Sequence, residues 1–523
     1  MEKGQKGRST IFHKLIFWVP SGRMAGICAV LALLLLLIPL FRIAQYAVPW
    51  YDDLNYGSFT KAAIETAPGV IGALRGAAEC VRVQWYAWQG TYSSIFFMAL
   101  MPAVWGEEYY FLGPVLLLLL LITGVFVLMR TVLKDIFHAD NDSCLTIQSV
   151  TAGMVLVLIY SSQAGIYWYN AGIHYVGMHS ILMMLTAALL HLLYEKKGWK
   201  RVILLFLSMA GAVVAAGSNF VSSLQGIIIL LSLMGLVCLC DRKKIWLYIP
   251  VLAVYGMGFY KNLGAPGNEV RSANYVGWGY PPAEAVLRSF PEALKYMVEF
   301  TGWITIAIMV LLIPVIWRMT EKSTFDFRLP GLVLAWSFCL YAAGFTPSLY
   351  SLGHGGLSRT LNAIKITYQI LLIINEIYWL GWFRRALSDK EGKLSVLNPA
   401  IKRTGRIFGN GCPWWFYALT GIWMFFIFSQ ASNQAGCYSS YGAYYYVHTG
   451  EAYNFYQQYL ERLEILKSDE KNVVFTPYRY KPWLICMGDL YEEPEREENR
   501  AVASWYDKDS VVVREDAGQG KQP

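Results

Sequence analysis

Two adjacent aspartates, Asp52 and Asp53, follow the first long apolar run of the sequence, which covers 24–41. A carboxylate from which water is partly excluded binds a proton more tightly than usual, so it can act as a general base. In a simpler interpretation, one aspartate is the N-cap of a helix over 54–66, but this explains one of them and not both. We therefore expect Asp52 and Asp53 to be catalytic. They are also where a divalent cation, Mg²⁺ or Mn²⁺, would bind if the reaction uses one.

Arginines from distant segments are the candidates for binding an anionic substrate. Arg271 follows Pro266–Asn268, a sequence typical of a turn because Gly and Asn tolerate positive φ. Arg359 follows a glycine-rich stretch, and Arg82 lies in the loop after the first apolar run. A planar guanidinium can bind a phosphate through two parallel hydrogen bonds. We expect these three arginines to bind phosphate, while snorkelling to lipid headgroups is the alternative role for Arg359.

Other polar and aromatic residues could assist at the same site. Glu107 and Glu108 could supply further carboxylates, or they could cap the span that starts at 111. Tyr167 and Trp168 could stack on a sugar ring, although an aromatic belt at the membrane interface is the commoner role. The accessory candidates are Glu107, Glu108, Asn268, His354, Tyr167 and Trp168.

The composition indicates which elements position these residues. Of 523 residues, 56% are hydrophobic and 15% are charged, and charge-free stretches long enough to cross a bilayer recur along the chain. We therefore expect an all-α polytopic membrane protein with about eleven transmembrane helices, within one or two. The short apolar segment 91–104 is expected to be re-entrant or interfacial. The expected spans are 24–45, 111–130, 144–160, 176–195, 201–217, 221–240, 245–260, 301–317, 330–346, 363–383 and 413–431.

Lysine and arginine clusters in short loops predict the orientation, because such clusters stay on the cytoplasmic side. The clusters lie before residue 24, at 196–201, at 242–244 and at 384–406. This places the N-terminus inside, and it places the loop 46–110 and the tail outside. Glu376, inside an apolar run nearer the cytoplasmic side, is expected to have a structural partner on a neighbouring helix.

Three regions follow from this threading. They are a basic, interfacial N-terminus at 1–23, a transmembrane domain at 24–431 and an extracytoplasmic domain at 432–523. The last is expected to be a small mixed α/β unit, with a helix at 453–467 and strands at 473–478, 484–490 and 511–513. The nine cysteines include no C-x-x-C pair, so a zinc site is not expected, and a disulfide between Cys437 and Cys486 stays open.

The acidic pair just after the first span resembles the GT-C superfamily of membrane glycosyltransferases. More closely, the order of motifs resembles a bacterial family of multipass membrane proteins, catalogued as a domain of unknown function (DUF6056) and related to glucosyltransferase-type enzymes. Two positions depart from that pattern, Thr91 in place of an arginine and Phe220 in place of an acid. The matching pieces are Tyr51-Asp52-Asp53-Leu54-Asn55-Tyr56-Gly57, Trp88-Gln89-Gly90-Thr91-Tyr92, Tyr167-Trp168 with Tyr175, Ala265-Pro266-Gly267-Asn268 with Arg271, Ser358-Arg359-Thr360, and Asn499 with Trp505-Tyr506.

The resemblance implies an enzyme of the bacterial plasma membrane. It would transfer a sugar from a polyprenyl-phosphate donor to a glycan, glycolipid or protein acceptor on the outer leaflet. No nucleic-acid partner and no ATP are expected, and the sequence contains no P-loop pattern. A transporter or lipid flippase, an envelope polysaccharide polymerase or ligase, and a non-catalytic scaffold are the alternatives.

Overall fold

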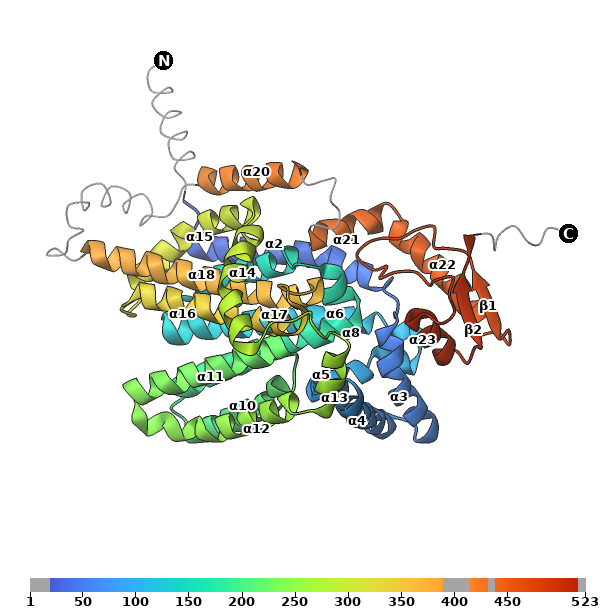
Figure 1. Cartoon of the computed structure of the whole chain (residues 1–523). Coiled ribbons are helices and arrows are strands. Elements are labelled where there is room, and N and C mark those ends of the chain that lie inside the picture. The colour runs from blue at the N-terminus through green and yellow to red at the C-terminus, as the bar shows by residue number, and fades with distance from the viewer. Residues whose placement is uncertain (1–18, 389–413, 431–437, 516–523) are drawn as a thin grey trace, which may run out of the picture.

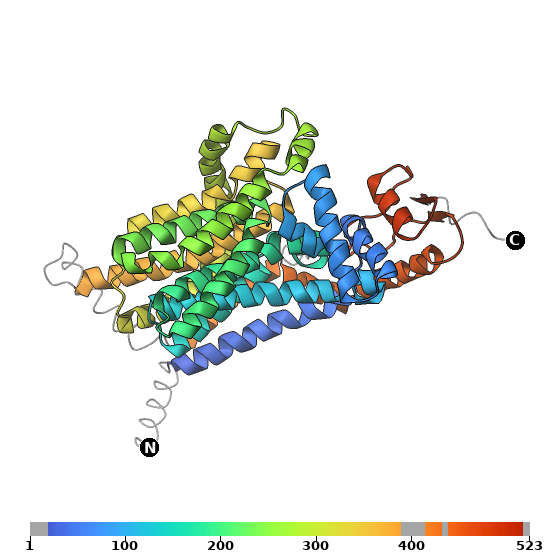
Figure 2. The ribbon, with the colours of Figure 1, turned by 90° about the horizontal axis from the view of Figure 1, so that it is seen from below.

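The computed structural model describes residues 19–388, 414–430 and 438–515. This part of the chain is almost entirely helical, and Figures 1 and 2 show long helices running side by side between two ends of the molecule. The first of them, α2 (Gly22–Ala44), begins after Ser21, whose hydroxyl accepts a hydrogen bond from Met24 N at 3.2 Å. Its leucine-rich sequence then continues without a charge until Arg42.

Among the described residues, eight helices are long and apolar enough to cross a membrane. The protein is therefore an all-α multi-pass membrane protein. These helices are α2, α6 (Leu112–Thr131) with its flanking turns η2 (Glu107–Tyr109) and η3 (Val132–Ile136), α9 (Met178–Tyr194) with the segment from Tyr169, α10 (Gly198–Ala216), α11 (Phe220–Cys240), α15 (Trp303–Lys322), α16 (Pro330–Ala343) with α17 (Thr346–Leu352), and α18 (Ser358–Ser388).

Three further predicted spans coincide with shorter helices, α7 (Asn141–Val157), α12 (Ile249–Leu263) and α20 (Trp414–Gln430). The longest have 17 residues, about 26 Å, which is less than the roughly 30 Å of a bilayer core. The number of crossings, about eleven, therefore stays a prediction. The segment predicted to be re-entrant forms only α5 (Tyr92–Ala99) and the turn η1 (Pro102–Trp105), which are too short to cross.

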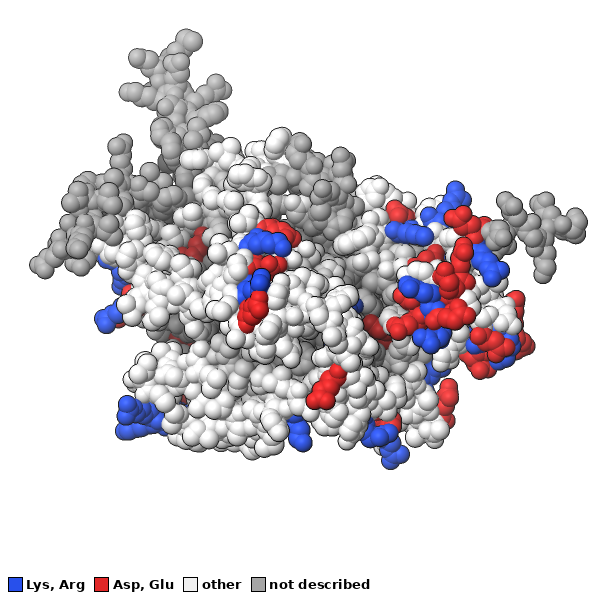
Figure 3. Space-filling model, in the orientation of Figure 1, with Lys and Arg blue, Asp and Glu red and all other residues white. Residues whose placement is uncertain are grey.

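The basic loops of the chain lie at one end of the bundle, and the first loop lies at the other end. At the end with the first loop, the turn after α10 meets α5, because Ser93 N donates to Gly217 O at 3.0 Å. The end of α12 meets the end of α10 there, since Asn262 Nδ2 donates to Ala216 O at 2.9 Å. The basic loops after α9 and α11 therefore lie at the other end, where Lys244 Nζ reaches Leu193 O at 2.8 Å. On the face shown in Figure 3, charged side chains gather at the two ends, and between them the main group belongs to α14 (Pro282–Phe300).

The end opposite the basic loops carries the helices of the first loop and the C-terminal unit. The loop forms α3 (Asp52–Thr66) and α4 (Val70–Ala87). The C-terminal unit lies beside α3 in Figure 1 and consists of α21 (Ser439–His448), α22 (Glu451–Leu466), β1 (Asn472–Phe475), α23 (Glu497–Trp505) and β2 (Ser510–Val513). Strands β1 and β2 pair in parallel, with Asn472 opposite Ser510.

Most predicted elements of the tail are present, with one exception. The helix at 453–467 and the strands at 473–478 and 511–513 correspond to α22, β1 and β2. The strand predicted at 484–490 is wrong, because Ile485 N and Cys486 N both donate to Pro482 O, at 3.1 and 2.9 Å, and this closes a turn. The boundary at 431–432, the cysteine Cys437 and most of the basic cluster at 384–406 lie outside the described residues.

Two glycines let the first loop lie against the end of α12 and the start of α13 (Pro266–Ala273), the helix that carries Arg271. A Cβ on Gly90 would lie 2.0 Å from Asn262 O, and a Cβ on Gly267 would lie 2.6 Å from Trp88 N. No side chain fits at either place, because both contacts are to backbone atoms. The approach of the α4–α5 connection to α13 therefore depends on glycine at both positions.

We predict that Gly90→Ala destabilises the folded protein by roughly 1–3 kcal/mol, the usual range for overpacking a close contact. Thermal unfolding of the full chain in detergent would measure this as a lower midpoint. Gly235→Ala is the matched control, because a Cβ on Gly235 meets nothing within 4 Å. Equal midpoints for the two variants would contradict the close approach.

Candidate functional site

The acidic pair stands at the first turn of α3, where the chain bends sharply. Tyr51, the residue before the helix, has φ +25° and ψ −86°, a conformation that is costly for a residue with a side chain. Asp52 and Asp53 are the first two helical residues, so their carboxylates lie near the positive end of the helix dipole. Because successive helical residues point about 100° apart, the two carboxylates enter different surroundings.

Asp53 is fully buried and holds three segments together. Its Oδ2 accepts hydrogen bonds from Trp50 N at 2.9 Å and from the Tyr110 hydroxyl at 2.7 Å, and its Oδ1 accepts from Asn170 N at 2.8 Å. Tyr110 continues the network by accepting from Tyr169 N at 3.0 Å. Burial raises the pKa of Asp53 to about 7, against the lowering effect of these three hydrogen bonds. Asp53 is thus engaged inside the protein, with no surface left for a substrate.

Asp52 is half-buried and keeps its carboxylate free. No hydrogen bond and no ion pair within 4 Å engages this carboxylate in the described part of the chain, whereas its backbone oxygen accepts from Asn170 Nδ2 at 3.3 Å. Burial raises the pKa of Asp52 to about 6, while the positive charge of Arg359 lowers it and Glu497 and Glu498 raise it. A carboxyl group with this pKa is mostly ionised at neutral pH and can accept a proton.

Arg359 is placed beside Asp52 by the first turn of α18. One turn later, Asn362 forms two hydrogen bonds with Ser161, in the segment that follows α7. Its Oδ1 accepts from Ser161 N at 2.8 Å, and its Nδ2 donates to Ser161 O at 3.0 Å. The guanidinium of Arg359 then lies over the ring of Trp168, with 5.7 Å from Cζ to the ring centroid. Arg359 forms no ion pair within 4 Å in the described residues, so its charge is available to a ligand.

Arg271 is placed by the glycine contact and by Asn268, a predicted accessory residue. Asn268 Oδ1 accepts from Gly90 N at 3.0 Å, and its Nδ2 donates to Asn262 O at 2.8 Å, so Asn268 is a structural link between α12 and the first loop. Arg271 Nη1 donates to Gln89 Oε1 at 2.5 Å, and its guanidinium lies 5.5 Å from the centroid of the Trp88 ring. Like Arg359, Arg271 forms no ion pair within 4 Å in the regions described.

Tyr56 marks the centre of the site. It lies one helical turn after Asp52 on α3 and is 7% exposed. Its hydroxyl lies within electrostatic range of Asp52, Arg271 and Arg359, and burial is the main cause that raises its pKa far above the usual value. Asp52 and two of the three predicted arginines therefore lie within electrostatic range of one hydroxyl at this end of the bundle.

The C-terminal unit forms one wall of the site. The Tyr51 hydroxyl donates to Glu497 Oε2, and the charges of Glu497 and Glu498 act on Asp52. Lys61 ties the same helices together, since its Nζ donates to Trp505 O at 2.7 Å and lies 4.4 Å from the centroid of the Trp505 ring. The motif of Asn499 with Trp505-Tyr506 lies in this region, but Glu497 and Glu498 belong to no motif, and α23 is more than 400 residues from α3.

The remaining charged candidates are engaged elsewhere. Arg82 pairs with Glu79 at 2.5 Å on an exposed face of α4, so it does not join Arg271 and Arg359. Glu107 pairs with Lys467, the residue that follows α22, at 3.0 Å and helps to attach the C-terminal unit, while Glu108 is exposed.

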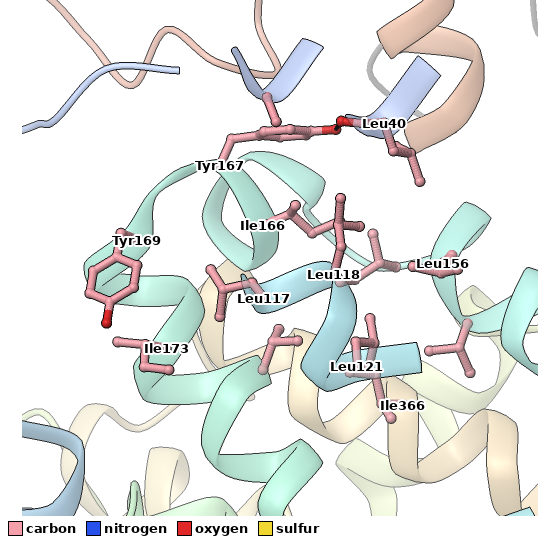
Figure 4. Close-up of a cluster of buried hydrophobic side chains, with 14 of the residues drawn as sticks. Leu40, Leu117, Leu118, Leu121, Leu156, Ile166, Tyr167, Tyr169, Ile173 and Ile366 are labelled. Atoms are coloured by element: carbon pink, nitrogen blue, oxygen red, sulfur yellow. Dashed lines mark hydrogen bonds between the residues drawn. The ribbon is translucent and has the colours of Figure 1, made fainter. Parts of the chain in front are cut away.

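The other candidates have structural surroundings too. His354 is exposed, and its Nδ1 accepts from Gly356 N at 3.2 Å within its own turn. Tyr167 is 1% exposed and donates to Leu40 O at 3.1 Å, which leaves no ring face for a sugar. Figure 4 shows Tyr167 lying against α2 with its hydroxyl directed to Leu40. Trp168 alone among these is half-buried beside a site residue, Arg359.

Within 19–388, 414–430 and 438–515, no three His, Cys, Asp or Glu side chains group as metal ligands. The carboxylate of Asp53 already accepts three hydrogen bonds inside the protein, whereas that of Asp52 accepts none in the described residues. Glu376 also departs from expectation, since its buried Oε2 has no hydrogen-bond partner in the parts of the chain described.

Comparisons with protein-family models, curated proteins and solved structures find no match to this chain. The resemblance to GT-C enzymes therefore stays a prediction from short motifs. The geometry around Asp52 is the main support for any function.

We predict different results for the two aspartates when each is replaced by asparagine. Asp53→Asn leaves at least one of three buried donors facing an NH₂ group, which costs roughly 1–3 kcal/mol of folding free energy. Asp52→Asn changes stability by less than about 0.5 kcal/mol, because no hydrogen bond is lost. Thermal midpoints of the two purified variants would measure this difference. A larger loss from Asp52→Asn would contradict the division of roles.

Proposed function

We propose that this protein is an inverting membrane glycosyltransferase of the GT-C type. It transfers a sugar from a polyprenyl-phosphate donor to a cell-envelope glycan, glycolipid or surface protein. The observation that supports this proposal is the arrangement at one end of the bundle, where the unengaged carboxylate of Asp52 lies near Arg359 and shares the neighbour Tyr56 with Arg271. A base and two cations are what displacement of a phosphate from a sugar carbon needs.

In this mechanism Asp52 accepts the proton of an acceptor hydroxyl. The acceptor oxygen attacks C1 of the sugar from the side opposite the phosphate, the bond from C1 to the phosphate oxygen breaks, and the configuration at C1 inverts. The bonding electrons leave with the polyprenyl phosphate. Arg271 and Arg359 stabilise the negative charge that develops on this leaving group.

Asp53 has a positioning role in the proposal. Its three hydrogen bonds hold the bend at Tyr51, the segment 169–172 and the start of α6 in one arrangement. This fixes the direction in which Asp52 points. A reacting group must be held to a fraction of an ångström for efficient catalysis.

The site faces the outer leaflet in this proposal. The basic loops at 196–201 and 242–244 lie at the other end of the bundle, and such loops stay in the cytoplasm. A lipid-linked donor and an envelope acceptor are both available at the outer surface of a bacterial plasma membrane.

We predict that Asp52→Asn abolishes transfer, because loss of a general base lowers the rate roughly 10²–10⁴-fold. Mass spectrometry of envelope glycans would compare cells that carry wild-type protein, the variant or no protein. Arg328→Gln is the control, since Arg328 is exposed and pairs with Asp326 at 3.2 Å away from the site. Glycans that are identical in all four strains, with equal membrane levels of each protein, would contradict an enzyme and favour a transporter or scaffold.

The raised pKa of Asp52 predicts a pH dependence. The base must be ionised, so the transfer rate should rise as the pH passes through about 6 and stay constant above it. The measurement is the initial rate of release of polyprenyl phosphate by the purified protein over a pH series. Asp52→Glu should retain a pH-dependent rate with a displaced midpoint. A wild-type rate that is flat through this range would remove Asp52 as the base.

A further inference from the structure

His174 has a buried ring nitrogen that no described residue satisfies. It lies in the π-helical turn η5 (Ile173–Gly177) and is 8% exposed, and its Nδ1 has no hydrogen-bond partner. Buried polar groups in folded proteins almost always have a partner, so an unpartnered one needs an explanation. Single π-helical turns are also frequent at functional sites.

The surroundings of His174 are well organised. Its backbone oxygen accepts from Asn219 Nδ2 at 2.6 Å, and Asn219 also caps α11 by accepting from Ser222 N at 3.0 Å. Five residues later, the buried His179 has a partner for each nitrogen, Ser222 Oγ at 3.1 Å and Thr367 Oγ1 at 3.1 Å. The same region therefore satisfies one histidine completely and holds the other in place with an open nitrogen.

Two positive charges lie within electrostatic range of the His174 ring. Arg271 and Arg359 both act electrostatically on His174, and neither has an ion pair within 4 Å in the described residues. The indole Nε1 of Trp168 is a second buried donor without a partner, and its ring lies beside the Arg359 guanidinium. Two cations and two nitrogens without hydrogen-bond partners are the donor set that a tetrahedral anion with several oxygens accepts.

We propose that His174 and Trp168 donate hydrogen bonds to the phosphate oxygens of a phosphoester whose charge Arg271 and Arg359 neutralise. These four residues come from three separate parts of the fold, α13, α18 and the segment 168–177. This inference rests on the proposed function in one respect, because it uses the same site, but it does not require that a sugar is transferred. It assigns His174, which no sequence motif indicates, as a binding residue for the phosphate.

Binding of simple phosphates to the purified full chain tests the cradle formed by these four residues. The probes are dodecyl phosphate, dodecanol and inorganic phosphate, added to protein in a neutral, phosphate-free detergent, and the readouts are the thermal midpoint and its dependence on probe concentration. We expect wild-type protein to be stabilised by dodecyl phosphate and not by dodecanol. Equal affinity for inorganic phosphate would identify the ligand as a free anion, and weaker affinity would identify it as a lipid headgroup; both support a phosphate site.

Replacements of His174 locate the contact. Asparagine keeps an amide near the position of Nδ1, glutamine places it nearer Nε2, and phenylalanine keeps only the ring shape. We predict that His174→Phe and His174→Gln weaken dodecyl phosphate binding roughly tenfold, as expected for a lost hydrogen bond to a charged group, while His174→Asn stays within a few fold of wild type. His179→Asn is the control, which should lower the thermal midpoint and leave the affinity unchanged.

Three results would overturn the inference. They are a wild-type protein that dodecyl phosphate does not stabilise, a folded His174→Phe variant with wild-type affinity, and a folded His174→Asn variant that binds as weakly as His174→Phe. Failure of the proposed enzyme is distinguishable from these. Phosphate binding that depends on His174, together with glycans that Asp52→Asn leaves unchanged, would refute the transferase and keep the phosphate site.

Discussion

A single buried carboxylate holds this end of the protein together. Asp53 accepts hydrogen bonds from backbone groups at Trp50 and Asn170 and from the side chain of Tyr110, so the end of the first span, the start of the second and the irregular segment before α9 meet at one point. Burying a carboxylate is costly, and only dense hydrogen bonding offsets the cost. The direction of the neighbouring Asp52 depends on this junction.

The membrane-spanning character of the chain was predictable because it is a local property. A run of apolar residues must form a helix in lipid, whatever the rest of the protein does, since its backbone groups have no other partners there. The tail was harder to predict. Leu484 and Ile485 are apolar, which favours a strand, and the structure buries both of them. They lie in a turn, however, because Ile485 N and Cys486 N donate to the oxygen of Pro482. Burial alone does not distinguish a strand from a packed turn.

The site was predictable only in part, because sequence shows which side chains are reactive and not which partners they meet. Arg359 acts electrostatically on Asp52, and Arg271 shares with it the neighbour Tyr56. Arg82 has the same chemistry but lies three residues after Glu79 on one helix and pairs with it. Asp53 is engaged in hydrogen bonds and Asp52 is not, and this difference depends on contacts of Asp53 with segments more than 50 residues away. Glu498 and His174 join the site through tertiary packing alone.

The contact between Tyr51 and Glu497 joins residues separated by 446 positions. A ribosome makes α3 long before α23, so the first span is inserted before its neighbour from the tail exists. Assembly of the site must wait until the tail has reached the same side of the bilayer as α3. A chain in which the tail has not yet arrived would have its first spans in the membrane and still lack one wall beside the carboxylate of Asp52.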